Sequence, residues 1–469
     1  MANRWIGAFA AVRREERPFA LLMFSYFFLV ITSFWILKPL KKSIFVEFYD
    51  QGGLLWLGTP LEAAQAELLA KVLNLVVAGA AVAIFSLLAQ RLRREKLSLL
   101  FVGCFVAGDL VFSALLVHPG ALSVWSFYLY GDLFATLMVA TFFAFLNDSV
   151  SPEGAKRLYA LVGLGGVLGG GVGSSLLSAW ISTLDAPHWL WICAGLALIV
   201  GAVAFAAARA AEWLPPDARA PQAAAAPPSE WRGLRAAALG ARLVLRSPYL
   251  LSIAGIVATY EIASTMVDFQ FTATVSHSLD GAAIGRQLSR VFAITNTVSV
   301  IVQLFLTSYL LTRFGVAVAL LVLPATMLTG SLTFLAVPSL WSGSLLNTAD
   351  FGFSYSVNQS AKEALYVPAT ADEKYHAKAF IDMFVQRLAK ALGAVASLAI
   401  TAWFASFASV RWLSLGTLAL LAVWIPTARY AGRRFRTLAS QRDRTPAASP
   451  RPVLDRNGAR AENTQRAPS

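Results

Sequence analysis

The sequence predicts an all-α polytopic membrane protein with about twelve transmembrane helices. Its 469 residues are 57% hydrophobic and only 14% charged, and the mean hydropathy is +0.62. A soluble domain of this length could not bury so much apolar surface, so lipid must be part of the solvent. Apolar stretches of about 20 residues, the length that crosses the apolar core of a bilayer, recur along the chain. Transmembrane strands would instead give short alternating segments, which the sequence does not show.

Twelve spans are expected in order along the chain. They lie at residues 19–37, 68–89, 97–117, 121–146, 158–180, 189–211, 249–272, 290–311, 314–337, 340–361, 379–402 and 411–430. The first stretch is too long for a signal-peptide core and runs into a lysine-rich segment rather than a small-residue cleavage site, so it should stay as a helix. Cys104 and Cys193 both fall inside expected spans and indicate neither a disulfide nor a metal site.

The net charge of +13 is a topology signal rather than a sign of nucleic-acid binding. With the amino terminus inside, every basic cluster falls on one side of the membrane, and the opposite connections carry almost no Lys or Arg. This is the positive-inside pattern, so we expect both termini in the cytoplasm of a bacterial inner (plasma) membrane. The clusters are Arg13, Arg14 and Arg17; Arg91, Arg93, Arg94 and Lys96; Lys156 and Arg157; Arg232, Arg235, Arg242 and Arg246; Arg313; and Arg429, Arg433, Arg434 and Arg436.

Composition divides the chain into four parts. Residues 1–211 form one six-helix bundle, and residues 248–430 form a second. Between them, residues 212–247 are an Ala- and Pro-rich cytoplasmic linker that ends in an interfacial helix from about residue 230. Residues 431–469 are expected to be a disordered basic cytoplasmic tail.

The two halves are similar to one another. Arg17-Pro18-Phe19 opens the first span and Ser247-Pro248-Tyr249 opens the seventh, a register on which Lys38 corresponds to Asp268. Short basic turns also recur after the second and eighth spans. Two similar six-helix halves around a cytoplasmic linker resemble the major-facilitator architecture, which implies a substrate site between the halves near the midplane.

Charged residues inside apolar spans are the main functional signal. Each would cost about 2.5–3.5 kcal/mol at a helix centre facing lipid, so most must face a polar cavity or one another. A cavity lined by both positively and negatively charged side chains suits a charged solute and indicates a secondary transporter. The residues are Lys38, Lys41, Lys42, Asp109, Asp132, Glu261, Asp268, Asp350, Asp382, Arg387 and Lys390.

The eleventh span shows this pattern best. Asp382, Gln386 and Lys390 are spaced at i, i+4 and i+8 and should form one stripe, with Arg387 beside it. The fifth span instead carries glycines at 165, 169 and 173. This small-xxx-small pattern indicates close helix packing rather than a phosphate loop, because no strand precedes it and no Gly-x-x-x-x-Gly-Lys motif exists.

Each intramembrane charge has a structural interpretation beside the functional one. Asp132 and Asp268 could form ion pairs with the lysines or take part in substrate or proton coupling. Asp109, Glu261, Asp350 and Asp382 are further coupling candidates. Asp109 and Glu261 could equally be satisfied by polar contacts within one half. Lys38, Lys41 and Lys42 could extend to the outer surface because they end a span, yet they are the main cationic cluster on that side.

Catalysis and bound cofactors are not expected. His118, His188, His277 and His376 lie isolated, without a metal-ligand spacing, and no Gly-x-Ser-x-Gly motif occurs. We therefore expect a monomeric transporter whose partners are a small-molecule substrate and the lipid bilayer.

Several motifs resemble the plastid- and parasite-type ATP/ADP translocase family. ILKPLKKSIFV at residues 36–46 is similar to the end of that family's first helix, and EGAKRLYALVGLG at 153–165 to its fifth. Asp132 in YGDLF and Asp268 fall where the family has carboxylates in helices four and seven. The most specific match is KEALYVP at 362–368, followed by Asp382 and Lys390.

The resemblance implies exchange of adenine nucleotides by alternating access, with lysines engaging phosphates and carboxylates assisting coupling. It places substrate contacts at Lys41, Asp132, Asp268 and Lys390, supported by Lys38, Lys362 and Arg387. A polyanion needs convergent cations, which agrees with this set.

The sequence also departs from that family. Asp268 is followed by Phe269 and Gln270 where the family has a lysine, and both carboxylates are Asp rather than Glu. The alternative is therefore a major-facilitator-type transporter of another organic anion, driven by protons through Asp132, Asp268 or Glu261. A scaffold or sensor that kept the fold is a third alternative, although a scaffold has no reason to keep so many intramembrane charges.

Overall fold

The fold is an all-helical membrane bundle, as the sequence predicts. The computed structural model describes residues 12–56, 58–219, 239–369, 376–403 and 407–444. Within these residues, eleven helices are long and apolar enough to cross a membrane. The only sheet of the described residues is a two-stranded hairpin of β1 (Leu54–Trp56) and β2 (Thr59–Leu61), which joins the first two helices.

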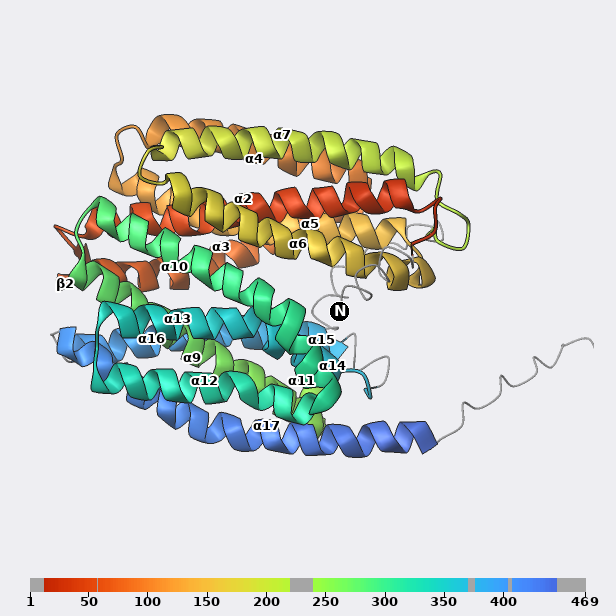
Figure 1. Ribbon diagram of the computed structural model, residues 1–469. Coiled ribbons are helices and arrows are strands. Elements are labelled where there is room, and N and C mark those ends of the chain that lie inside the picture. The colour runs from red at the N-terminus through yellow and green to blue at the C-terminus, as the bar shows by residue number, and fades with distance from the viewer. Residues whose placement is uncertain (1–11, 57, 220–238, 370–375, 404–406, 445–469) are drawn as a thin grey trace, which may run out of the picture.

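Among its described residues, the amino-terminal half contains six helices. They are α2 (Arg17–Tyr49), α3 (Ala63–Arg91), α4 (Arg94–Leu115), α5 (Ala121–Ser149), α6 (Pro152–Trp180) and α7 (Ala186–Ala211). Prolines at the starts of α2, α6 and α7 suit a first helical turn, where the missing N–H has no intrahelical partner. In Figure 1 these helices form the upper half of the molecule.

Within the described residues, the carboxyl-terminal half contains six helical runs, three of which are interrupted by π-helical stretches. The runs are α9 (Pro248–Ser278); α10 (Ala282–Ile301) continued through a π-helical stretch (Val302–Thr307) into α11 (Ser308–Arg313); α12 (Val316–Ala336); α13 (Leu340–Phe353), a π-helical stretch (Ser354–Asn358) and α14 (Gln359–Leu365); α15 (Lys378–Phe380), a π-helical stretch (Ile381–Val385) and α16 (Gln386–Trp403); and a 3₁₀ turn (Phe407–Arg411) before α17 (Trp412–Arg444). These runs form the lower half in Figure 1.

The α13–α14 run corresponds to the tenth expected span, residues 340–361, and its composition sets it apart from the eleven apolar helices. It carries Asn347, Asp350, Ser356 and Asn358, all of which are buried. A helix this polar depends on neighbouring helices to satisfy its side chains. π-helical turns of this kind often lie at functional sites.

Two expected boundaries are corrected. The first helix does not end near residue 37 but continues to Tyr49, so its three lysines lie inside the helix. The last helix continues to Arg444, because Phe435 and Leu438 still pack against the carboxyl-terminal core, so residues 431–444 are not a disordered tail. The first residues of the linker, 212–219, lie within the described part of the chain.

That first part of the linker packs against the start of α6. The hydroxyl of Ser151 donates a hydrogen bond to the backbone carbonyl of Asp217 at 2.6 Å, and Arg13 forms an ion pair with the Asp217 carboxylate at 2.7 Å. Residues 239–246 are helical, in agreement with part of the expected interfacial helix. The remainder of that helix, and the tail beyond residue 444, lie outside the described residues.

Glycines let α6 pack directly on the backbone of α2. A Cβ atom at Gly165 would lie 2.5 Å from the carbonyl oxygen of Phe24, and Cβ atoms at Gly169 and Gly173 would meet the backbone of Phe28 and Thr32. Three contacts in register along one helix pair confirm that this glycine run serves packing.

Two apolar cores lie within the halves, and a third joins them. The first core belongs to the amino-terminal half, and the second belongs almost wholly to the carboxyl-terminal half. The third draws on both halves, with Phe45 and Val46 from α2, Phe271 from α9, and Ile284 and Leu288 from α10. It lies near the end of the molecule that carries β1 and β2, which we call the hairpin end.

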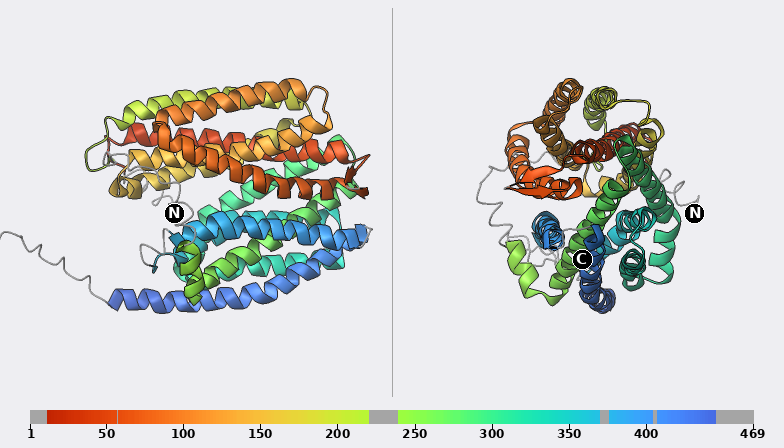
Figure 2. Two further views of the ribbon diagram at one scale, coloured as in Figure 1. Left: turned by 180° about the vertical axis from the view of Figure 1, so that it is seen from behind. Right: turned by 90° about the vertical axis from the view of Figure 1, so that its left-hand side faces the viewer.

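The opposite end, where α2 begins and α17 ends, is called the terminal end. Figures 1 and 2 show the ribbons of the two halves diverging toward it, and the end-on view in Figure 2 shows one half above the other. The structure therefore has the halves joined at the hairpin end.

Candidate functional site

The candidate site is built around the lysines of α2. Lys38, Lys41 and Lys42 lie within one turn of each other, and the side chains of Lys41 and Lys42 are only 6% and 5% exposed. The structural alternative, in which these lysines extend to the outer surface, does not hold for Lys41 and Lys42, because the helix continues past them for nearly two more turns and their side chains are buried. Such buried cations need partners from neighbouring helices.

Lys42 belongs to a four-residue ion-pair cluster that crosses from one half to the other. Its Nζ lies 2.8 Å from Oδ1 of Asp268 and 3.8 Å from Oε1 of Glu67. Lys71 pairs with Glu67 at 2.8 Å and also with Asp268. We call Lys42, Glu67, Lys71 and Asp268 the inter-half cluster, since Asp268 comes from α9 and the other three come from α2 and α3.

The inter-half cluster carries two positive and two negative charges, so it is formally neutral. Removing one partner from a buried pair costs about 3–5 kcal/mol because an uncompensated charge remains. Asn347 from α13 adds a hydrogen bond to Oδ1 of Asp268 at 3.5 Å. An anion that competes with Asp268 for the two lysines would therefore loosen a contact between the halves.

Lys41 stays within the amino-terminal half. It forms an ion pair with Asp132 of α5, and its Nζ lies 4.2 Å from the ring centroid of Tyr128. The Tyr128 hydroxyl in turn donates a hydrogen bond of 2.7 Å to Glu67, which links Lys41 to the inter-half cluster. Asp132 is 26% exposed, so the Lys41–Asp132 pair borders accessible space.

Lys38 is held by aromatic rings rather than by a carboxylate. Its Nζ lies 4.6 Å from the ring centroid of Trp35, 4.8 Å from that of Phe351 and 5.7 Å from that of Tyr355. The Tyr355 hydroxyl also lies 3.4 Å from Nζ. Among the described residues, no ion pair involves Lys38, so its charge is available to an incoming anion.

Lys390 and Gln386 of α16 converge on Glu261 of α9. The Gln386 amide donates a hydrogen bond of 2.6 Å to Oε1, and the Nζ of Lys390 lies 3.6 Å from Oε2. The Lys390 side chain is 57% exposed although it lies inside a helical run, whereas that of Glu261 is 8% exposed.

The expected stripe on the eleventh span is only partly correct. Gln386 and Lys390 share a face, but Asp382 pairs instead with Lys362 of α14 at 3.6 Å. Asp382 lies in the π-helical stretch, whose wider turn shifts the register by about one residue and rotates the carboxylate away. Lys362 and Asp382 therefore form a separate pair rather than part of the central group.

Three other candidates form no ion pair, among the described residues, with the central lysines, by which we mean Lys38, Lys41, Lys42 and Lys71. Asp109 is buried in α4 and accepts a 2.7 Å hydrogen bond from Tyr130, all within the amino-terminal half. Asp350 is buried in α13 and accepts a 2.6 Å hydrogen bond from Ser264. Arg387 is half-buried and takes part in no ion pair of the described residues.

Glu67, Lys71, Tyr128 and Tyr355 are not among the sequence-based candidates. Glu67 falls one residue before the expected second span, and a Glu–Lys pair at i, i+4 is typical of a solvated helix face. The position of Lys71 inside an apolar span was the sequence signal that could have identified it as a site residue. Tyr355 carried no such signal, because aromatic residues are common in membrane spans.

Solved structures of similar fold define the fold class of this protein. A bacterial homologue of the human lysosomal transporter Spinster, in an inward-facing and unoccupied conformation, superposes with a TM-score of 0.56 at 12% identity, covering 91% of this chain and 98% of that one. The nucleoside transporter NupG also superposes with a TM-score of 0.56 at 13% identity, covering 91% of this chain and 99% of that one. The chain thus has the two-bundle, major-facilitator-like fold of membrane transporters.

Sequence comparison then gives the family. The model described as TLC ATP/ADP transporter matches residues 119–350 and 339–435, so this chain belongs to the TLC ATP/ADP transporter family. It is a multi-pass membrane protein of a transporter family, as the motifs predicted.

Three curated relatives show how far the similarity extends. ADP,ATP carrier protein 2 of Chlamydia pneumoniae is 26% identical over 42% of this chain and 41% of its own length. ADP,ATP carrier protein 1 of the same organism is 23% identical over 69% of this chain and 71% of its own length. The chloroplastic ADP,ATP carrier protein 2 of Arabidopsis thaliana is 21% identical over 68% of this chain and 56% of its own length. The first alignment thus spans less than half of the relative.

Proposed function

We propose that this chain exchanges adenine nucleotides across a bacterial inner membrane, with both termini in the cytoplasm and without a catalytic step. The names of its relatives support ADP and ATP as the pair. The observation that carries the proposal is the inter-half cluster, in which Lys42 and Lys71 hold Asp268 across the boundary between the halves. Phosphate oxygens are the competing ligands that such lysines would accept.

In the proposed mechanism, substrate phosphates replace carboxylates as partners of the central lysines. Lys38 supplies a cation that has no ion-pair partner among the described residues, and the exposed Lys390, which pairs with Glu261, supplies a second cation from the carboxyl-terminal half. Once the phosphates engage Lys42 and Lys71, Asp268 no longer joins the halves and they can rock. Without substrate the cluster keeps the halves joined, which couples movement in one direction to movement in the other.

The first prediction concerns exchange itself. Vesicles containing the purified chain and loaded with ADP should take up labelled ATP several times faster than vesicles loaded with buffer. ATP carries about four negative charges and ADP about three, so each exchange moves about one charge, worth about 2.3 kcal/mol per 100 mV. An imposed membrane potential should therefore change the rate.

Collapsing the proton gradient is the matched control. The alternative function, proton-driven transport of another organic anion, is favoured by the absence of a lysine after Asp268. It predicts no dependence on internal ADP and a loss of transport when the gradient is collapsed. Uptake that needs protons but not ADP would replace the proposed exchange with this alternative.

A second prediction concerns Lys38. Because Lys38 has no carboxylate partner among the described residues, Lys38→Gln leaves no buried anion unpaired, and the thermal midpoint should stay within a few degrees of wild type. The KM for ATP should rise roughly tenfold, since one charge-assisted contact is lost.

The control is Lys96→Gln. Lys96 is exposed near the start of α4, away from the central lysines. This variant should leave both the KM and the thermal midpoint unchanged. A Lys38→Gln protein with a wild-type KM would remove Lys38 from the proposed substrate site.

A further inference from the structure

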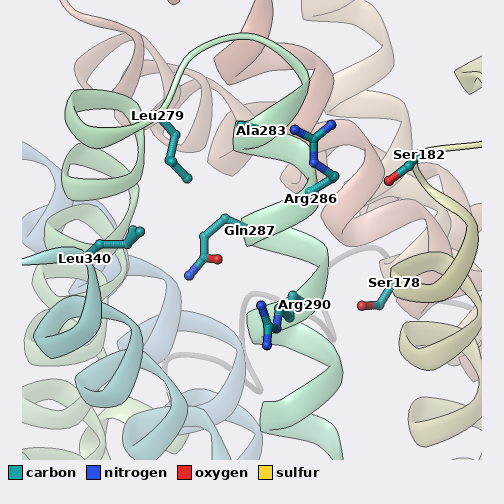
Figure 3. Close-up of a pocket in the computed structure, with 8 residues that line it drawn as sticks. All are labelled: Ser178, Ser182, Leu279, Ala283, Arg286, Gln287, Arg290 and Leu340. Atoms are coloured by element: carbon teal, nitrogen blue, oxygen red, sulfur yellow. The ribbon is translucent and has the colours of Figure 1, made fainter.

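A hollow at the hairpin end separates the last turn of α6 from the first turns of α10. Its volume is about 350 Å³, and it is lined by Ser178 and Ser182 on one side and by Leu279 and Leu340 on the other. Figure 3 shows α10 between them, with Arg286 and Arg290 rising from it. Because α6 belongs to one half and α10 to the other, the hollow lies between the halves.

Arg286 and Arg290 are spaced at i, i+4 and are both exposed. Neither arginine forms an ion pair with any of the described residues. Glu47 of α2 lies against Gly285 on a neighbouring face of α10 and interacts electrostatically with Arg286, but no ion pair within 4 Å joins its carboxylate to either guanidinium. Gln287 between them is held by a hydrogen bond of 3.1 Å to Ser344.

The placement of these arginines is unfavourable without a partner. They lie at the end of the molecule where the positive-inside pattern leaves few basic residues. Two exposed guanidiniums that form no ion pair within the described residues, at an end otherwise poor in cations, indicate an anion as a partner, and their planar donor forks match phosphate oxygens.

We propose that this hollow is a peripheral phosphate-binding site, in which Arg286 and Arg290 hold a phosphate group opposite the hydroxyls of Ser178 and Ser182. The phosphate belongs either to a nucleotide arriving at the hairpin end or to a lipid headgroup. The nucleotide form rests on the proposed function and makes the hollow a loading site ahead of the central lysines. In both forms the bound phosphate bridges the two halves.

Chemical protection tests the site without requiring transport. The full chain, in vesicles of phosphatidylcholine alone, is treated with an arginine-specific dicarbonyl reagent, and the modification of each arginine is read by mass spectrometry. Inorganic phosphate or ATP should slow modification of Arg286 and Arg290 roughly tenfold. Arg313, an exposed arginine at the terminal end, serves as the internal control and should react at the same rate throughout.

Vesicle composition distinguishes the two sources of phosphate. Protection by soluble phosphate in phosphatidylcholine assigns the site to a nucleotide, and protection that needs added phosphatidylglycerol assigns it to a lipid headgroup. The proposal would be overturned if neither soluble phosphate nor phosphatidylglycerol slowed the modification of Arg286 and Arg290 more than that of Arg313. If the chain moved no nucleotide, the proposed function would fail. Protection by inorganic phosphate would still show whether the hollow binds a phosphate group.

Transport adds a second readout. If the source is a nucleotide, Arg286→Gln with Arg290→Gln should raise the KM for ATP supplied at the hairpin end roughly tenfold and leave the maximal rate unchanged. Arg313→Gln is the matched control. If the source is lipid, the double variant should slow exchange only in vesicles that contain phosphatidylglycerol.

Discussion

Replacing Asp268 with asparagine is expected to reduce exchange more than about a hundredfold while the protein still inserts. In the inter-half cluster the carboxylate of Asp268 faces both Lys42 and Lys71. Without it, two buried cations share the single charge of Glu67. A loss of about 3–5 kcal/mol is typical for removing one partner of a buried pair, and 3 kcal/mol corresponds to more than a hundredfold shift between two states.

The measurement is the initial rate of ATP uptake into ADP-loaded vesicles, beside the thermal midpoint in detergent. Lys71→Met combined with Asp268→Asn removes one charge of each sign and restores the balance of the cluster. It should recover most of the lost thermal stability but not the exchange rate, because Lys71 is a proposed phosphate ligand. An Asp268→Asn protein that exchanges nucleotides at the wild-type rate would contradict the role of the cluster.

Gly169→Val is expected to abolish the folded protein. The Cβ atom alone would lie against the backbone carbonyl of Phe28, which cannot rotate away as a side chain can. Inserting side-chain atoms into a packed interface costs about 1–3 kcal/mol where side chains adjust. At Gly169 the neighbouring atoms belong to the backbone of α2, so α2 and α6 would have to separate along their length. The loss of stability should therefore exceed that range.

Gly163→Ala in the same helix is the matched control. Nothing lies within 4 Å of a Cβ atom at Gly163, so alanine should be neutral or slightly stabilising through its better helix propensity. The yield of monodisperse protein and the thermal midpoint report both variants. If Gly169→Val unfolded at the wild-type temperature, the close packing of α2 and α6 would not contribute to stability.

The central lysines show how far sequence could predict the site. Ion pairs with the lysines were one of two interpretations that the sequence left open for Asp132 and Asp268, because charges in apolar spans must meet one another or a polar cavity. The structure contains such pairs for both carboxylates. Which lysine meets Asp268 was not foreseen. Lys38 corresponds to it in the repeat register, but Lys42 and Lys71 make the contacts.

The remaining differences have local physical causes. Asp382 leaves the stripe of Gln386 and Lys390 because a π-helical turn changes the register, and short sequence patterns do not report such turns. Lys71 was overlooked because a Glu–Lys pair at i, i+4 also describes an ordinary solvated helix. Asp109 lies apart because the order of helices around a bundle is set by packing.

Hydropathy alone determined that this chain is a helical membrane protein, because each span must satisfy its own backbone within lipid. The motifs added the family, and the spacing of Gly165, Gly169 and Gly173 added one close helix contact. The tertiary structure decided which charges pair, that the halves are joined at the hairpin end, and that Arg286 and Arg290 border a hollow between the halves. Those features depend on residues brought together from helices distant in sequence, and helical periodicity fixes only the face that each residue occupies on its own helix.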